Sequence, residues 1–226
     1  MKHLLLLHGA IGAKDQLVPL AESLKDKFTV HALSFGGHGG EPMPDVFSIE
    51  VFAKDVLNYL KKNNLEKINI FGYSMGGYVA LYLAKYHPGK IDKIFTLATK
   101  FAWTPDISQK EIRMLDAAKI EEKVPAFAKT LAERHAPHEW KILLKKTSDM
   151  MVGLGFKNSL TLEDLESITA ECIISVGDDD NMVTLDETKA MAHHLKNGKL
   201  HIFPDMLHPI EKVDLDELSK EIVSFF

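Results

Sequence analysis

Hydrophobic residues gather in six short runs that are bounded by turn residues. These runs lie at 4–8, 28–35, 68–71, 94–98, 172–176 and 200–203. Each has the length of a β-strand, and most are continuous rather than alternating. Continuous runs are typical of parallel strands that are covered on both faces. The pattern therefore predicts a parallel sheet buried between two layers.

Helical spacing of hydrophobic residues separates these runs. The stripes are Leu17, Leu20 and Leu24, then Ile49, Phe52, Val56 and Tyr59, and finally Leu215, Leu218, Ile222 and Phe225. Thr184 and Glu187 form a capping-box pattern at the start of a predicted helix over 185–196, and Pro88-Gly89 ends another helix. The alternation of strands and helices predicts an α/β fold. Its sheet is open and mostly parallel, with about six strands and helices on both faces.

One stretch, 105–161, carries no strand signal. Its capping pattern and hydrophobic pairs predict three or so short helices: Ser108 with Glu111, Ile112 with Leu115, Phe127 with Leu131, and Trp140 with Leu143 and Leu144. The stretch falls between the fourth and fifth strands, so it would lie over the carboxyl ends of the strands, where open sheets bind ligands. We therefore expect a core domain formed by 1–104 and 162–226 and a small helical cap at 105–161.

Composition and charge exclude several classes of protein. The 226 residues are 46% hydrophobic and 26% charged, which is close to the average soluble domain. The net charge is -5 and the basic residues are scattered, which argues against a nucleic-acid partner. Four leucines after Lys2 are too few for a signal peptide, and no membrane span is expected.

A single cysteine, Cys172, cannot form an internal disulfide. A reducing, cytoplasmic location is therefore the simpler expectation. Cys172 lies in an apolar run, which predicts a small buried hydrophobic side chain rather than a reactive thiol. The sequence leaves the oligomeric state open, a homodimer included.

The segment Gly72-Tyr73-Ser74-Met75-Gly76-Gly77 matches the pattern G-x-S-x-G. It follows a predicted strand directly and precedes a helical segment, which is the setting of a nucleophile elbow. A serine in such a strained turn needs neighbours without a Cβ, and the following helix directs its N-terminus toward a developing oxyanion. Taken alone, the pentapeptide is also compatible with a glycine-rich turn that carries an ordinary serine.

A serine hydroxyl needs a base, and that base needs a carboxylate to orient it. In folds of this topology the chain order is serine, acid, histidine. The run Asp178-Asp179-Asp180 follows the fifth predicted strand, and His208 follows the sixth. Both positions lie at carboxyl ends of strands, so order and topology together favour Ser74 as a catalytic nucleophile.

With these motifs the sequence resembles the α/β-hydrolase superfamily, in its small capped branch of carboxylesterases and enol-lactonases. The resemblance covers almost the whole chain and includes His8-Gly9-Ala10 after the first strand and Gly36-Gly37-His38-Gly39-Gly40 after the second. In this family the strand that carries the oxyanion loop is preceded by others, whereas here it is the first strand, so a sheet of six strands rather than eight is expected. The resemblance also implies that the first motif is the oxyanion loop, with backbone N–H donors from Ala10 and Met75 and a structural role for His8.

The family pattern also selects the acid. A glycine is followed after two residues by the acid and after three more by a valine, which points to Asp180, with Val183 as its marker. Asp178 remains the alternative. Relatives usually have glycine before the catalytic histidine, whereas this chain has Leu207.

Other polar residues are assigned lesser roles. His135 and His138 could be imagined as a metal pair, but no third ligand accompanies them, so no metal site and no cofactor are expected. Glu211 matches a frequent structural acid on the final helix. Both arginines, Arg113 and Arg134, lie in the predicted cap, which argues against a lyase that places arginine in its pocket.

The side chains expected at the pocket are mostly apolar. From strand tips and cap they are Ile11, Tyr73, Met75, Phe101, Trp103, Phe127, Trp140, Met150 and Met151. Such a pocket suits an uncharged acyl or alkyl group. We therefore expect an esterase-like serine hydrolase (EC 3.1.1) that cleaves a small carboxylic ester, lactone or thioester. The alternatives are a carbon–carbon bond hydrolase or perhydrolase with the same triad, and a non-catalytic ligand-binding protein on the same fold.

Overall fold

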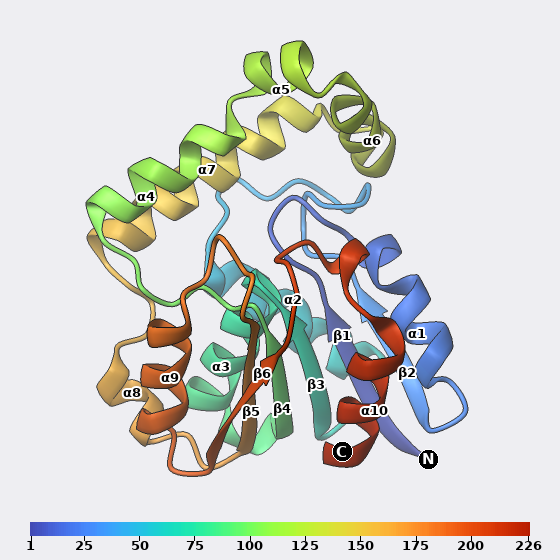
Figure 1. Ribbon diagram of the computed structural model, residues 1–226. Coiled ribbons are helices and arrows are strands. Elements are labelled where there is room, and N and C mark those ends of the chain that lie inside the picture. The colour runs from blue at the N-terminus through green and yellow to red at the C-terminus, as the bar shows by residue number, and fades with distance from the viewer.

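The computed structural model describes all residues, 1–226, and a six-stranded sheet forms its centre (Figure 1). The strands are β1 (Lys2–Leu7), β2 (Phe28–Leu33), β3 (Ile68–Tyr73), β4 (Ile91–Leu97), β5 (Glu171–Gly177) and β6 (Gly198–Phe203). Their order is β2-β1-β3-β4-β5-β6, and every neighbouring pair is parallel. The predicted α/β class with six parallel strands is confirmed.

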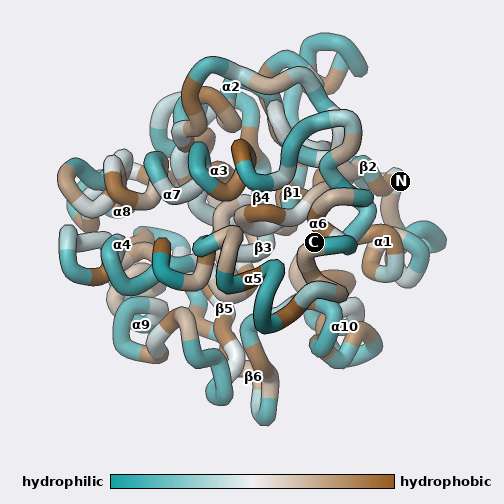
Figure 2. Tube along the Cα trace, turned by 90° about the horizontal axis from the view of Figure 1, so that it is seen from above, coloured by the Kyte–Doolittle hydropathy of each residue, from teal (hydrophilic) through white to brown (hydrophobic).

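Helices cover both faces of this sheet, as Figure 2 shows from above. They are α1 (Val18–Leu24), α2 (Ile49–Lys62), α3 (Met75–Tyr86), α8 (Leu162–Glu166), α9 (Leu185–His194) and α10 (Leu215–Phe225). Helices α1 and α10 pack on one face, and α2, α3 and α9 pack on the other. The sheet is therefore wound on both sides, which explains why its strands read as continuous hydrophobic runs.

Strand β1 illustrates this burial. Its residues Leu4, Leu5, Leu6 and Leu7 are all fully buried. Alternate side chains point to opposite faces: Leu4 and Leu6 join the core beneath α1 and α10, and Leu5 and Leu7 join the core beneath α2 and α3. Burying each leucine contributes about 1.5–3 kcal/mol. This strand therefore holds the loop that follows it firmly in place.

Local signals set most element boundaries. The capping box of Thr184 and Glu187 is present, and the helix that it begins ends at His194, two residues earlier than expected. Strand β4 begins at Ile91, three residues before the hydrophobic run. The second residue of the strand is the exposed, polar Asp92, which interrupts the run of hydrophobic residues, so the run alone does not show where the strand begins. Cys172 is fully buried, and burial raises its pKa to about 12.

Four helices lie above the carboxyl ends of the strands (Figure 1): α4 (Pro105–Ile112), α5 (Ala117–Lys123), α6 (Pro125–His135) and α7 (Trp140–Phe156). We call them the cap helices. Helix α7 has 17 residues and is not short, because buried side chains from Trp140 to Leu154 keep one continuous stripe. None of the helices of this protein is both long and apolar enough to cross a membrane.

Candidate active site

Ser74 occupies the turn between β3 and α3. Its backbone has φ 51° and ψ -116°, a conformation that non-glycine residues adopt only under strain. The Ser74 N–H donates to the carbonyl of Leu97 on the neighbouring strand at 2.8 Å, so the turn is attached to the sheet. Such strain persists where the surrounding structure fixes it and is typical of functional turns.

The glycines on either side of Ser74 leave no room for a side chain. A Cβ at Gly72 would lie 2.5 Å from the Cα of Gly77, and a Cβ at Gly76 would lie 2.4 Å from the carbonyl oxygen of Leu7. Because both neighbours are backbone atoms, neither can move aside cheaply. The G-x-S-x-G spacing therefore follows from the close packing of β1, β3 and α3 around the turn.

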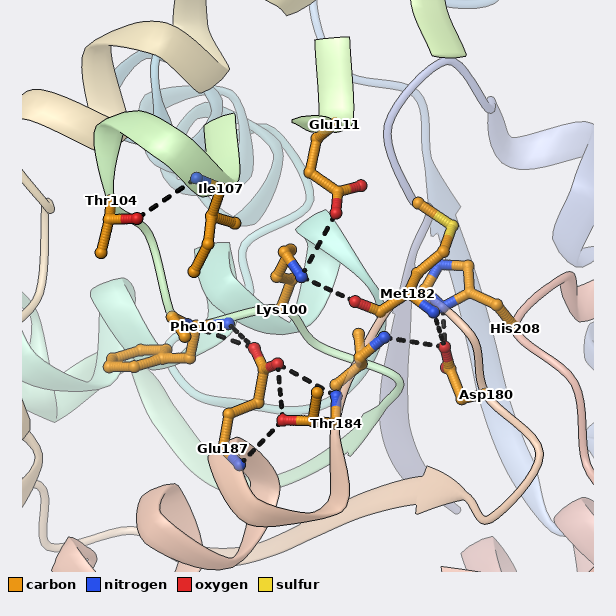
Figure 3. A network of polar contacts seen from close by, with 12 residues as sticks. Lys100, Phe101, Thr104, Ile107, Glu111, Asp180, Met182, Thr184, Glu187 and His208 are labelled. Atoms are coloured by element: carbon orange, nitrogen blue, oxygen red, sulfur yellow. Dashed lines mark hydrogen bonds and ion pairs between the residues drawn. The ribbon is translucent and has the colours of Figure 1, made fainter. Parts of the chain in front are cut away.

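His208 and Asp180 form a hydrogen-bonded pair (Figure 3). The Nδ1 of His208 lies 2.8 Å from Oδ2 of Asp180, and both side chains are buried, at 9% and 1% exposed. The other oxygen of Asp180 accepts N–H bonds from Met182 and Val183, each at 2.8 Å. Three N–H groups therefore contact this carboxylate and fix its direction toward His208.

The neighbouring aspartates have other positions. Asp178 is exposed and accepts the backbone N–H of Asp205 at 2.7 Å, while Asp179 is exposed to solvent. Asp205 has φ 53°, and the bond from Asp178 fixes this turn ahead of His208. The structure thus places Asp180 against His208 and gives Asp178 a role in shaping the loop.

Tyr73 holds the histidine loop from below. Its hydroxyl donates to the backbone carbonyl of His208 at 3.0 Å, and burial raises its pKa, so it stays a neutral donor. Leu207, where relatives usually have glycine, is 40% exposed and does not adopt a positive φ. This position therefore accepts a side chain without disturbing His208.

His8 fixes the backbone of the loop after β1. His8 is fully buried, and its Nδ1 donates to the carbonyl of Gly9 at 2.7 Å while its Nε2 accepts the N–H of Phe35 at 3.1 Å. The Gly9 carbonyl and the Ala10 N–H belong to one planar peptide, so His8 fixes the direction of that N–H. Met75 is the first residue of α3, where a helical N–H has no partner within the helix.

His135 connects the cap to these loops. It lies at the end of α6 and is fully buried. Its Nδ1 accepts the N–H of Gly39 at 3.1 Å, so Nε2 carries the hydrogen and donates to the carbonyl of Ile11 at 3.0 Å. His138 similarly donates to the carbonyl of Glu41 at 2.7 Å. Both nitrogens of His135 and one nitrogen of His138 are therefore engaged, and no group of three or more possible metal ligands exists in this protein.

Three buried histidines form a cluster beneath the cap: His8, His38 and His135. Burial lowers the pKa of His8 to about 4, lowers the pKa of His38 well below its usual value, and lowers the pKa of His135. Each ring already accepts an N–H or faces its neighbours' rings, so an added proton would be costly. These three rings are therefore neutral in the folded protein at neutral pH.

The free energy of unfolding should fall as the pH falls from about 7.5 to about 5. In the unfolded chain these histidines bind protons near pH 6.5, whereas in the folded chain they bind them only at lower pH, so acid favours unfolding. His8 alone should remove about 2 kcal/mol between about pH 7.5 and about pH 5. Urea unfolding at the two pH values measures this.

A matched pair of variants tests whether the buried histidines cause this dependence of stability on pH. His8→Gln should flatten the dependence of stability on pH, whereas His87→Gln, at an exposed histidine, should leave it as in the unmodified protein. Equal stability of the unmodified protein at both pH values would contradict the account of the buried cluster.

A cavity of about 340 Å³ lies between the cap helices and these loops. Of its 23 lining residues 15 are hydrophobic, so its wall is mainly apolar. Ser74, His208, Ala10 and Met75 share this wall. His208 has one ring hydrogen bond, to Asp180, so its Nε2 is the nitrogen that remains for the Ser74 hydroxyl. No hydrogen bond joins these two groups, and bonds of this kind often tighten only in a complex with substrate.

Most of the expected pocket residues lie on the cavity wall: Ile11, Tyr73, Trp103, Phe127, Met150 and Met151. Phe101 and Trp140 do not. Phe101 is 4% exposed, and its ring stacks on Tyr78 with centroids 5.1 Å apart. Trp140 is 7% exposed and packs in the hydrophobic core. Both large aromatic side chains therefore stabilise the fold beside the cavity rather than line it.

Sequence reasoning did not expect charged residues in the cavity wall. Lys100 follows β4, Glu111 lies on α4, and the two side chains meet at 3.4 Å inside the cavity wall. Gln16 and Glu211 also line the cavity and are joined by a hydrogen bond of 2.7 Å. Only the capping pattern had drawn attention to Glu111, and no sequence motif marks the pairing. No arginine lines the cavity.

Comparisons with known proteins agree with this architecture. A family model described as the alpha/beta hydrolase fold matches residues 2–137. The mouse (Mus musculus) protein "Serine hydrolase BPHL" is 26% identical over 98% of this chain and 78% of its own length. "3-oxoadipate enol-lactonase 1" from Acinetobacter baylyi is 24% identical over 92% of this chain and 82% of its own length.

Solved structures show the same fold. The 2-hydroxy-6-oxo-6-phenylhexa-2,4-dienoate hydrolase from Rhodococcus sp. strain RHA1 superimposes with a TM-score of 0.84 at 19% identity and covers 99% of this chain and 89% of its own. A thermophilic esterase from Thermogutta terrifontis gives 0.80 at 18% identity, over 100% of this chain and 89% of its own. By its family model, its sheet order and its elbow, the chain belongs to the α/β-hydrolase family.

Proposed function

We propose that this protein is a serine hydrolase that cleaves small, mostly apolar carboxylic esters through an acyl-enzyme. The observation that carries the proposal is the meeting of three features in one cavity. These are the strained turn of Ser74, the ring of His208, which is hydrogen-bonded to Asp180, and the residues Ala10 and Met75. The relatives named as a serine hydrolase and an enol-lactonase support hydrolysis at a carbonyl carbon.

The first step is acylation. Ser74 Oγ attacks the ester carbonyl carbon while Nε2 of His208 takes the hydroxyl proton, and Asp180 stabilises the resulting imidazolium. The N–H groups of Ala10 and Met75 donate to the oxyanion, and the N-terminus of α3 favours its negative charge. The bond to the alcohol oxygen then breaks, and His208 gives its proton to the leaving alcohol.

The second step releases the acid. Water attacks the acyl carbon and gives a proton to His208, after which the bond to Ser74 Oγ breaks and the proton returns to Ser74. All atoms come from the ester and one water molecule. The reaction needs no cofactor in this scheme.

The cap helices supply the walls of the reaction chamber in this proposal. Residues 105–161 contribute the apolar Met114, Leu115, Phe127, Met150 and Met151 to the cavity. Apolar walls favour an uncharged acyl or alkyl group and exclude water from the oxyanion. We therefore propose the division into a core domain and a cap, with the cap setting the length of the substrate.

Hydrolysis of para-nitrophenyl acetate and butyrate tests the reaction class. We expect turnover with a burst of nitrophenol equal to the enzyme concentration if deacylation is slower than acylation. A folded protein that shows neither burst nor turnover would contradict the proposal. A β-diketone and an acetate–peroxide mixture serve as comparison substrates, because preferential turnover of either would assign carbon–carbon hydrolysis or perhydrolysis instead.

A further inference from the structure

The apolar cavity contains one ion pair, and its two members come from different parts of the fold (Figure 3). Lys100 follows β4 in the core, whereas Glu111 extends downward from the cap helix α4. The Nζ of Lys100 lies 3.4 Å from Oε1 of Glu111, and the side chains are only 13% and 6% exposed. Both residues line the cavity that Ser74 and His208 line.

Lys100 is held firmly in this position. Its Nζ donates to the carbonyl of Met182 at 2.6 Å, in the loop that carries Asp180. The next two backbone N–H groups, those of Phe101 and Ala102, donate to Glu187 on α9 at 2.9 and 3.2 Å. Both the ammonium group of Lys100 and the backbone that follows it are therefore held in place. The side chain loses little conformational entropy when it binds a further group.

Each member of the pair keeps an unused hydrogen-bonding site. An ammonium has three N–H donors, and Lys100 uses one of them in its hydrogen bond to Met182, while its contact with Glu111 is an ion pair. One oxygen of Glu111 faces Lys100, while the other points away from it and has no hydrogen-bond partner in the protein (Figure 3). The cavity thus offers one charged donor and one charged acceptor side by side in a mainly apolar wall.

A neutral hydroxyl complements this arrangement, because it donates one hydrogen bond and accepts others. A carboxylate on the substrate would be attracted by Lys100 but repelled by Glu111, and an ammonium would meet the reverse. We propose that the Lys100–Glu111 pair is a specificity site for an uncharged hydroxyl group on the acyl chain of the substrate. Lys100 donates to the hydroxyl oxygen, and the hydroxyl donates to the free oxygen of Glu111.

A purely structural ion pair is a weaker explanation of these residues. Buried ion pairs are often no more stabilising than apolar side chains of similar size. An apolar pair would join α4 to the core equally well and would leave no unused donor and acceptor in the cavity. The unused sites therefore favour a ligand-binding role.

The test compares esters that differ only at the end of the acyl chain, and it rests on the proposed esterase function. The substrates are para-nitrophenyl hexanoate and octanoate, each with a methyl, hydroxyl, carboxylate or ammonium group at the ω-position. The unmodified protein should show the highest kcat/KM for the hydroxyl ester at one chain length. It should favour this ester by about tenfold or more over both charged esters, because each charged ester meets a like charge in the pair.

Substitution should then change specificity in opposite directions. Glu111→Gln leaves the Lys100 charge unmatched, so the carboxylate ester should gain about tenfold or more relative to the hydroxyl ester. Lys100→Gln leaves the Glu111 charge unmatched, so the ammonium ester should gain instead. Glu121→Gln is the matched control, because Glu121 pairs with Lys141 on the exposed surface of the cap and should leave all ratios unchanged.

The outcomes are distinguishable. If Glu111→Gln changes kcat/KM for all four end groups by one common factor, the pair is structural and the inference is wrong. If no ester is cleaved by the folded, unmodified protein, the proposed function itself fails. If Lys100→Gln does not fold, the carboxylate ratio of the nearly isosteric Glu111→Gln decides the question alone.

Discussion

Ser74→Ala should lower kcat/KM for para-nitrophenyl butyrate by about 10⁴–10⁶-fold while the protein remains folded. The loss follows because no other hydroxyl can attack the carbonyl from the elbow, and the N–H donors alone support only a small residual rate. The fold should survive, since serine and alanine both carry a Cβ and experience the same strain at φ 51°. Steady-state kinetics and thermal unfolding measure the two effects.

A serine away from the cavity provides the control for this variant. Ser23 lies on α1 and does not line the cavity, and its hydroxyl contacts Leu20 and Ser219. Ser23→Ala should retain the full activity. An Ser74→Ala protein that keeps more than about one hundredth of the activity would rule out nucleophilic catalysis by this residue.

The second large effect concerns the choice between two aspartates. Asp180→Asn should lower kcat by about 10⁴-fold, because an amide would direct its NH₂ group at Nδ1 of His208 and favour the wrong tautomer. The same substitution at Asp178 should cost no more than about threefold. That carboxylate is exposed, and an asparagine oxygen can still accept the N–H of Asp205.

These two variants are matched in chemistry and differ only in position. The activity of both variants should be measured across the same range of pH. A large loss in Asp178→Asn together with an active Asp180→Asn would reverse the assignment of the acid.

The sheet and the site core could be predicted because their signals are local. Burial on both faces gives β1 an unbroken leucine run, and the elbow needs Gly72 and Gly76 for steric reasons that the structure displays directly. The position of Asp180 followed from a family spacing, and the structure places it against His208.

The features that escaped prediction depend on contacts between distant segments. Phe101 and Trp140 were expected in the pocket because they are apolar and lie at a strand tip and in the cap. Side-chain direction cannot be read from spacing, and both pack in the core. His135 reaches back to Gly39 and Ile11, and Glu111 reaches across the cavity to Lys100. The sequence near His135 or Glu111 carries no pattern that identifies its partner, because the cap helices and the loops beneath them meet only in the folded chain.

Covalent labelling with a fluorophosphonate tests the central claim most directly. The probe reacts with a serine only when a base and an oxyanion site activate it, so it reports on the assembled site rather than on any one substrate. Intact mass followed by peptide mapping should find one adduct per chain, located on Ser74, and none in Ser74→Ala. A folded protein that stays unlabelled, or that carries its adduct on another residue, would contradict the assignment of Ser74 as the nucleophile and favour a non-catalytic binding protein.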